Sequence, residues 1–211
     1  MAIKLIGFPQ PPNTLRVVLT LNELGLPFEL EPVTDIQTIK TEDFIANKHP
    51  FGKVPVLIDG DFVIHESRAI CRYLISKYQK DAKVVLIPDD PNKAAIVEQY
   101  LSYETAYYDP PLTKIVYQEL VIKNFLGKPI DEAVVKQALE EIEKVLDIYE
   151  KILEGKDYLT GEYSFADLLH AGCAQYIYAD TAHSYIFEKR PNVKRWIANL
   201  RNRDAFKKTY A

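Results

Sequence analysis

The side chains best able to do chemistry in this sequence do not gather into a metal or redox motif. The two cysteines, Cys71 and Cys173, lie about 100 residues apart with no CxxC spacing, which is typical neither of a disulfide framework nor of a zinc site. We expect both to be small buried side chains in a reducing compartment. His65 and His170 are expected to be structural, and no residues have metal-ligand spacing. The sequence therefore predicts no metal.

Asn13 stands where a helix is expected to begin, after a proline-rich break. Its side chain has two amide donors, and the helix dipole there favours an anion by roughly 0.3–1 kcal/mol. Asparagine is also a favoured N-cap, so Asn13 could serve only to start its helix. Thr14 could donate a hydrogen bond in its place. Both interpretations of Asn13 stay open at this point.

The elements that must position such residues alternate between strand and helix over the first 80 residues. Strands are predicted at 3–7 and 28–32, with a helix between them. A hairpin at 54–64 is followed by a helix for which Ser67 is a favourable N-cap. A β-α-β crossover followed by a β-β-α unit is the thioredoxin-like layout.

The rest of the chain carries helical signals alone. The stretch 92–126 is expected to kink at Asp109-Pro110-Pro111, because proline lacks an N–H and clashes with the preceding turn. Ser164-Phe165-Ala166-Asp167 predicts a capping box, with serine at the N-cap and aspartate reaching back from the third helical position.

Together these signals predict an α/β thioredoxin-like N-terminal domain over residues 1–80 and an all-α C-terminal helical bundle over residues 92–211. Residues 81–91, which contain Pro88-Asp89-Asp90-Pro91, form the predicted linker.

Composition and charge exclude several classes of protein. The chain is 47% hydrophobic and 27% charged, as expected of an ordinary folded protein. The net charge is −4 with no basic stripe, so nucleic acid is not an expected partner. Lys4 interrupts the first apolar run, and no stretch approaches the ~20 apolar residues of a membrane span. We expect a cytoplasmic protein that does not bind membranes.

Three strings, in the right order and spacing, resemble motifs of the glutathione transferase family. They are His49-Pro50-Phe51-Gly52-Lys53-Val54-Pro55 for N-P-x-G-x-V-P, Glu66-Ser67-Arg68-Ala69-Ile70 for E-S-x-A-I, and Gly161-Glu162-Tyr163-Ser164-Phe165-Ala166-Asp167 for G-x-x-S-x-A-D. The chain is identified as a member of this family, and Phe51 and Tyr108-Asp109-Pro110 are most similar to its phi class.

The resemblance implies glutathione as the co-substrate. Val54-Pro55 would be a cis peptide bond, which leaves the Val54 N–H and C=O free to pair with the cysteinyl unit. At the γ-glutamyl end, Glu66 would bind the α-ammonium and Ser67, at a helix N-terminus, the α-carboxylate. The implied glutathione-binding residues are Lys40, Lys53, Val54, Pro55, Glu66 and Ser67, the two lysines lying near the glycyl carboxylate.

The sequence departs from the phi pattern at the catalytic position. The serine that donates to the sulfur would fall on Pro11, which has no donor. Gln10-Pro11-Pro12-Asn13-Thr14 instead resembles the opening of nu-type bacterial and yeast nitrogen-regulator-like transferases, in which the asparagine lies near the sulfur. The catalytic candidates are therefore Asn13 and, less directly, Thr14.

The resemblance further implies an apolar second-substrate site, for which Tyr107, Tyr108 and Tyr117 are the candidates. It implies a homodimer in which Phe51 enters the partner. The predicted reaction is conjugation of glutathione thiolate to hydrophobic electrophiles in detoxification. Because Pro11 replaces the serine, activity could be low. The alternatives are glutathione-dependent reduction of disulfides or peroxides, and a non-catalytic ligandin-like carrier.

Overall fold

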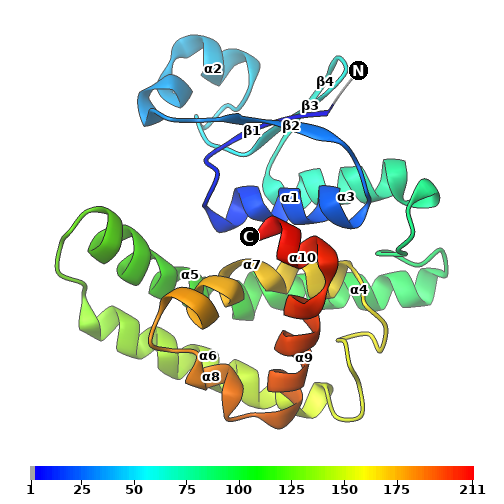
Figure 1. Ribbon diagram of the computed structural model, residues 1–211, viewed down its shortest axis with the longest axis vertical. Coiled ribbons are helices and arrows are strands. Elements are labelled where there is room, and N and C mark those ends of the chain that lie inside the picture. The colour runs from blue at the N-terminus through cyan, green and yellow to red at the C-terminus, as the bar shows by residue number, and fades with distance from the viewer. Residues whose placement is uncertain (1–2) are drawn as a thin grey trace. The chain divides into compact units, whose positions relative to one another are not determined.

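The computed structural model describes residues 3–211, which divide into two compact units (Figure 1). One unit comprises the described residues up to Val85 together with Asp204–Ala211, and the other comprises Leu86–Arg203. Met1 and Ala2, at the start of the predicted first domain, lie outside the described residues. Within residues 3–211, no helix has the length and apolar character that crossing a membrane requires.

A four-stranded sheet in the order β2-β1-β3-β4 forms the centre of the first unit. Strand β1 (Ile3–Gly7) pairs in parallel with β2 (Phe28–Pro32) and antiparallel with β3 (Val56–Asp59). Strand β4 (Phe62–His65) pairs antiparallel with β3 across a tight turn in which Gly60 has a φ of 64°. The predicted thioredoxin-like layout is confirmed.

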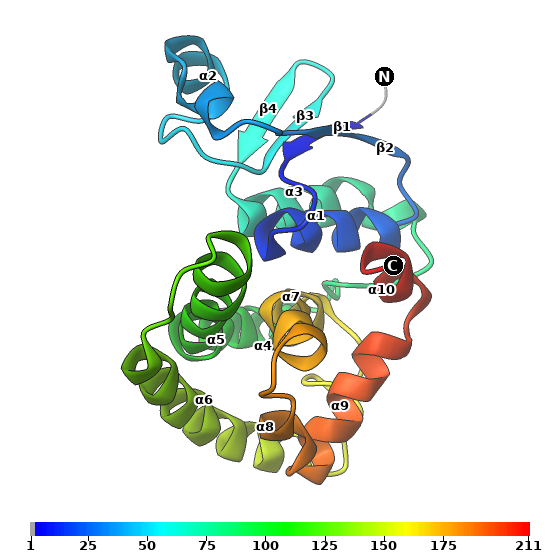
Figure 2. The same cartoon turned by 60° about the vertical axis from the view of Figure 1, so that its left-hand side comes forward.

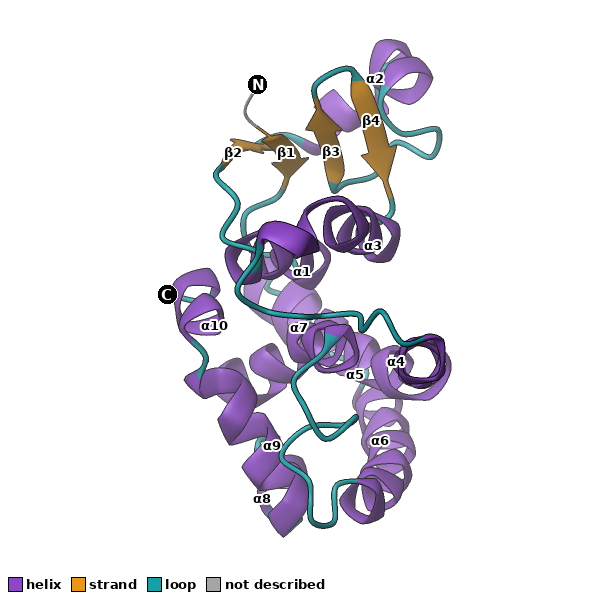
Figure 3. Cartoon of the chain, turned by 90° about the vertical axis from the view of Figure 1, so that its right-hand side faces the viewer, coloured by secondary structure: helices purple, strands orange, loops and turns teal. Residues whose placement is uncertain are grey.

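Helices α1 (Pro12–Glu23) and α3 (Ser67–Tyr78) pack together on one face of this sheet (Figure 2; Figure 3). Helix α10 (Asp204–Thr209) packs on α1, where Asn22 Nδ2 donates to Thr209 Oγ1 at 2.9 Å. This packing explains why the last helix belongs to the sheet unit although it follows the helical one in the chain.

Two short helices that the sequence did not predict lie in the connection between β2 and β3. They are η1, a 3₁₀-helix (Ile36–Lys40), and α2 (Glu42–Asn47). Each begins at a side-chain cap, from Asp35 to the Gln37 N–H and from Thr41 to the Phe44 N–H. Helices of five and six residues are too short to show a 3.6-residue period, which is why the pattern missed them.

The second unit contains only helices among its described residues, which confirms the predicted helical bundle. In chain order they are α4 (Pro91–Tyr103), η3 (Glu104–Tyr108), α5 (Asp109–Val116), η4 (Tyr117–Phe125), α6 (Glu132–Ile152), α7 (Phe165–Asp180), α8 (Tyr185–Glu188) and α9 (Pro191–Asn202). Pro110 and Pro111 stand in the first turn of α5, and the π-helical turn η3 lies directly before them. The regular helix is thus interrupted where the prolines predicted it.

The core of the helical unit gathers around Trp196, which is completely buried. Its indole N–H donates to Asp167 at 2.9 Å. The rings of Tyr108, Tyr149 and His170 surround it at centroid distances of 5.6–6.2 Å. His170 therefore has the structural position expected of it.

Candidate active site

A buried arginine joins the starts of α1 and α3. The Arg16 side chain donates from Nη1 to Asn13 Oδ1 at 3.0 Å and to Ser67 Oγ at 2.9 Å. Only 1% of Arg16 is exposed, so the bond to Ser67 is fully buried. The structure thus brings together two residues for which the sequence predicted separate roles.

The chemistry of arginine determines how its two partners are oriented. A guanidinium can only donate, so Asn13 must face Arg16 with its carbonyl oxygen, and its NH₂ group points elsewhere. Ser67 likewise accepts with its oxygen and keeps its own hydroxyl proton. Both residues therefore retain a hydrogen-bond donor.

Asn13 is the second residue of α1, which begins at Pro12. The interpretation of Asn13 as merely the N-cap is wrong, because Pro11 holds that position and has no side-chain cap bond. Proline at the first helical position is favourable, since its φ is already helical and its missing N–H would have no partner there. Thr14 is 1% exposed, and a Cβ on Gly7 would lie 2.7 Å from its Oγ1, so Thr14 packs against the end of β1.

The start of α3 differs by one residue from the prediction. Glu66, and not Ser67, is the N-cap, because the Glu66 carbonyl already accepts from the Ile70 N–H at 2.9 Å. Glu66 has a φ of 69°, a left-handed conformation that costs a non-glycine residue of order 1–3 kcal/mol. Such strain concentrates at functional sites, and the Glu66 side chain is 65% exposed beside the start of the helix.

The peptide bond between Val54 and Pro55 is cis, as the resemblance implied. Val54 lies just before β3, and neither its N–H nor its C=O takes part in a backbone hydrogen bond within the described chain. Lys40 donates from Nζ to the carbonyl of Gly52 at 2.6 Å, which holds its ammonium group near this segment. The side chain of Lys53 is exposed.

Two histidines pack beside Glu66. The rings of His49 and His65 lie 4.3 Å apart and are tilted by 32°. His49 is 2% exposed, its Nδ1 accepts from the Phe51 N–H at 3.2 Å, and its Nε2 lies 3.6 Å from a carboxylate oxygen of Glu66. Burial lowers the pKa of His49 below its usual value, and His65 lowers it further against the opposing effect of Glu66.

These side chains resemble a metal-ligand set by distance alone. One donor atom from each of His49, His65 and Glu66 lies within 4.8 Å of the others. Because His49 Nδ1 accepts a backbone N–H, the neutral ring carries its proton on Nε2, which then has no lone pair for a metal. The hydrogen bond from Phe51 thus favours a proton on Nε2, which faces Glu66, over a metal ion at this position.

The three tyrosines predicted for the second-substrate site have different surroundings. Tyr107 and Tyr117 are 60% and 52% exposed. Tyr108 is buried in the core of the helical unit, where it stacks on Tyr149 and contacts His170. Core packing alone therefore accounts for Tyr108.

An open groove of about 740 Å³ lies on the helical unit, mainly along α6. Apolar side chains such as Val135 and Leu139 line it together with glutamates. None of the predicted site residues borders it. It is therefore separate from the site built around Arg16.

Sequence reasoning overlooked Arg16 and His49, both of which the structure places at the site. A signal for Arg16 was present, since it is a charged residue within the apolar run Leu15 to Leu19, three residues after Asn13. A signal for His49 was its position in place of the asparagine of N-P-x-G-x-V-P.

Comparison with known proteins agrees with this geometry. The glutathione S-transferase N-terminal domain model matches residues 5–82, and the C-terminal domain model matches residues 74–204. Glutathione S-transferase 3 of Zea mays is 41% identical over 99% of this chain and 93% of its own length.

Two solved structures show that the likeness in sequence is also a likeness in fold over nearly the whole chain. The chain is 37% identical to glutathione transferase F7 of Populus trichocarpa, with a TM-score of 0.92 over 99% of this chain and 98% of that one. It is 32% identical to maize glutathione S-transferase I in complex with an atrazine glutathione conjugate, with a TM-score of 0.90 over 99% and 96% of the two chains. The chain belongs to the glutathione S-transferase family, as its three motifs predicted.

Proposed function

We propose that this glutathione S-transferase joins the thiolate of glutathione to hydrophobic electrophiles, with Asn13 and Ser67 as the groups that hold the tripeptide over Arg16. The observation that carries the proposal is the buried Arg16, which orients one hydrogen-bond donor at each of two helix starts. The relative that binds an atrazine glutathione conjugate supports conjugation over the reductase and carrier alternatives.

The γ-glutamyl end of glutathione fits the start of α3. Its α-carboxylate would accept from the Ser67 hydroxyl and from the first-turn N–H groups, where the helix dipole favours an anion. Its α-ammonium would pair with the exposed carboxylate of Glu66. The strained φ of Glu66 is consistent with a residue held for binding.

The remainder of glutathione would follow the segment before β3. The free N–H and C=O of Val54 can pair with the cysteinyl unit as an added strand, next to Pro55. Lys40 and Lys53 would attract the glycyl carboxylate, and the bond to Gly52 positions Lys40 for this role.

Thiol activation is assigned to Asn13. Lowering the thiol pKa from about 8.5 by ~2 units requires about 2.7 kcal/mol. The Asn13 NH₂ group can donate to the sulfur, and the Arg16 charge behind it favours the thiolate. Thr14 is the weaker candidate because it packs against Gly7. The opening with Pro12 and Asn13 is thus proposed to work as in the nu-type and yeast nitrogen-regulator-like enzymes.

The test is the pKa of bound glutathione, measured by ultraviolet titration of the thiolate. We expect a value well below that of the free thiol, and a rise of about one unit in Asn13→Ala. Asn47→Ala changes an exposed asparagine on α2 that bonds Asp43, and it should leave the bound pKa unchanged. A bound pKa near the free value in the wild type would exclude the conjugating function.

For the second substrate, we propose Tyr107 and Tyr117 as ring surfaces for an apolar electrophile, since both are exposed. The KM of a hydrophobic electrophile should rise in Tyr107→Ala and Tyr117→Ala, whereas the KM of glutathione should not. Because Tyr108 is buried, we do not propose it as a residue that contacts the substrate.

We also propose a phi-like homodimer in which Phe51, 72% exposed, inserts into the partner. Phe51→Ser should shift the protein from dimer to monomer in analytical ultracentrifugation. An unchanged dimer would assign the interface to other residues. The cytoplasmic location stays a prediction.

A further inference from the structure

A histidine occupies the place of the asparagine in the N-P-x-G-x-V-P segment and lies buried beside Glu66. We propose that His49, as a neutral imidazole, positions the Glu66 carboxylate for the ammonium group of glutathione, and that protonation of His49 weakens glutathione binding. This inference rests on the proposed function, because it requires Glu66 to bind the γ-glutamyl end.

The tautomer of His49 follows from its contacts. Nδ1 accepts from the Phe51 N–H, so the neutral ring carries its hydrogen on Nε2. Nε2 lies 3.6 Å from Glu66 Oε1, and a small closure would make this a hydrogen bond. A neutral donor orients the carboxylate and leaves its full charge for the ligand.

Glu66 needs such a partner because little else fixes its side chain. It is 65% exposed and makes no cap bond to its own helix. His49, by contrast, is buried, accepts a hydrogen bond from the Phe51 N–H and packs against the His65 ring. The buried ring can therefore position the exposed carboxylate.

Four charged or titratable groups act on His49. His65 on β4 lowers its pKa, as do Lys53 and Lys40 more weakly, whereas Glu66 raises it. Burial adds the largest lowering effect. His49 is consequently neutral at neutral pH and gains its proton only under more acidic conditions.

A protonated His49 would compete with the ligand. The imidazolium would form an ion pair with Glu66 and repel the α-ammonium of glutathione. Between about pH 5 and 7 the ligand's ammonium and carboxylates keep their charges, so the change is due to the protein.

The experiment measures the dissociation constant of S-methylglutathione by titration calorimetry from about pH 5 to pH 7.5. The thioether removes thiol ionisation from the result. We expect the wild-type dissociation constant to rise about fivefold toward the acid end, as for one exposed ion pair. In His49→Asn, which restores the family's residue, the affinity should not depend on pH.

Two controls isolate the mechanism. An S-methylglutathione analogue without the α-amino group should bind more weakly, with no acid-side loss in the wild type. His65→Phe keeps a ring against His49 and removes the neighbouring imidazole. It should retain the pH dependence with a higher midpoint, because the lowering effect of His65 on the pKa of His49 is gone. His49→Gln replaces His49→Asn if the latter does not fold.

The same acid-side loss in wild type and His49→Asn would overturn the proposal. So would competition between S-methylglutathione and micromolar Zn²⁺ that depends on His49, since metal binding requires a lone pair on Nε2. No binding of S-methylglutathione at any pH would instead overturn the proposed function, and the inference with it.

Discussion

Carboxylates of the protein accept from backbone N–H groups at the starts of helices α7 and α9 in the helical unit, whereas the N-cap side chain of α3 in the sheet unit makes no cap bond. At α7 both bonds of the predicted capping box are present, between Ser164 and Asp167. Asp167 also accepts from the Leu159 N–H at 3.0 Å and from Trp196. This helix start is buried and leaves no room for a ligand.

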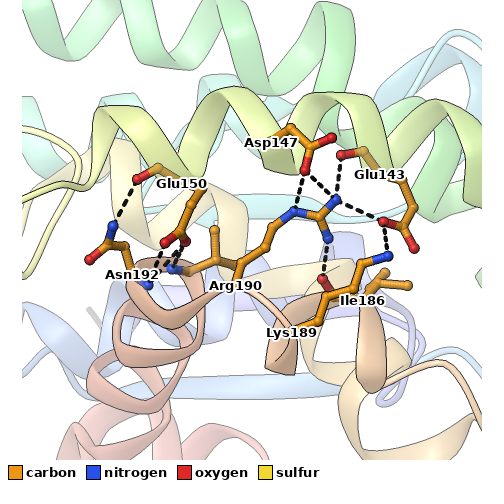
Figure 4. Close-up of polar contacts among 8 residues, drawn as sticks. Glu143, Asp147, Glu150, Ile186, Lys189, Arg190 and Asn192 are labelled. Carbon is orange, nitrogen blue, oxygen red and sulfur yellow. Dashed lines mark hydrogen bonds and ion pairs between the residues drawn. The ribbon is translucent and has the colours of Figure 1, made fainter.

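The first N–H groups of helix α9 also require an acceptor, and a carboxylate from a different helix, α6, provides it (Figure 4). The carboxylate of Glu150 on α6 accepts from the N–H groups of Asn192 and Val193 at 3.0 Å. Arg190, just before α9, donates to Asp147 at 2.6 Å and to Glu143 at 2.7 Å. These bonds attach α9 to α6.

At α3 the N-cap residue, Glu66, makes no side-chain hydrogen bond to the first turn. The Glu66 carboxylate lies 3.6 Å from His49 Nε2, and the Ser67 hydroxyl is oriented by Arg16. Where the fold provides its own carboxylate, a helix start adds stability. Where it does not, the same N–H groups can bind the carboxylate of a ligand.

The strongest test of this contrast is Asp167→Ala. The substitution leaves the buried N–H groups of Leu159, Ser164 and Trp196 without their acceptor, and we expect a loss of about 3 kcal/mol in the free energy of unfolding. Urea unfolding followed by the fluorescence of Trp196 measures it. Asp157→Ala, at an exposed ion pair with Arg195, should cost far less.

The pH dependence of Asp167 adds a second readout. Burial raises the pKa of its carboxyl to about 6 from an ordinary 3.8, against the hydrogen bonds that favour the charged form. The folded state therefore holds this proton more tightly than the unfolded state. The contribution of Asp167 to stability should be complete below about pH 4 and decline as pH rises through about 6. The stability difference between wild type and Asp167→Ala should shrink accordingly, and a difference that grows with pH would contradict the assignment.

Glu150→Ala should have the next largest effect on stability. Removing the carboxylate from the start of α9 should cost about 2 kcal/mol, because charge-assisted bonds to two N–H groups are lost. The measurement is urea unfolding. Glu140→Ala changes an exposed glutamate on the same helix and is the matched control. Equal losses of unfolding free energy in the two variants would show that the Glu150 carboxylate adds no more stability at the start of α9 than an exposed glutamate does elsewhere on α6.

Ser67→Ala tests whether the start of α3 binds glutathione. We expect the KM of glutathione to rise about tenfold, because a hydroxyl donor to a carboxylate is lost. The free energy of unfolding should change less than in Glu150→Ala. Ser102→Ala, whose hydroxyl bonds only its own helix at Glu98, should leave KM unchanged. A loss of stability with KM unaffected would make Ser67 a structural residue.

The smallest expected effect is that of Lys40→Ala. An exposed ammonium near a carboxylate contributes little, so the KM of glutathione should rise about threefold. The effect should fade at high salt, because exposed charges are screened. Lys93→Ala, an exposed lysine at the start of α4, provides the comparison. An effect independent of salt would indicate that Lys40 acts through its bond to Gly52 instead.

The sequence by itself determined the features that depend on local chemistry. Periodicity and turn residues predicted the four strands and the long helices, and Ser164 with Asp167 predicted a capping box that the structure shows bond for bond. The prolines predicted the interruption of the regular helix before Pro110. The resemblance to family motifs also predicted the cis peptide bond at Val54-Pro55, which the structure has.

Only the tertiary structure decided which polar groups meet. Arg16 and Ser67 are 51 residues apart in the chain, and no local rule pairs them; they meet because α1 and α3 pack on the same face of the sheet. His49 and Glu66 come together in the same way, beside β4. Helix starts are visible in a sequence because caps are local. Whether a start is closed by a distant carboxylate or left for a ligand depends on contacts between elements far apart in the chain.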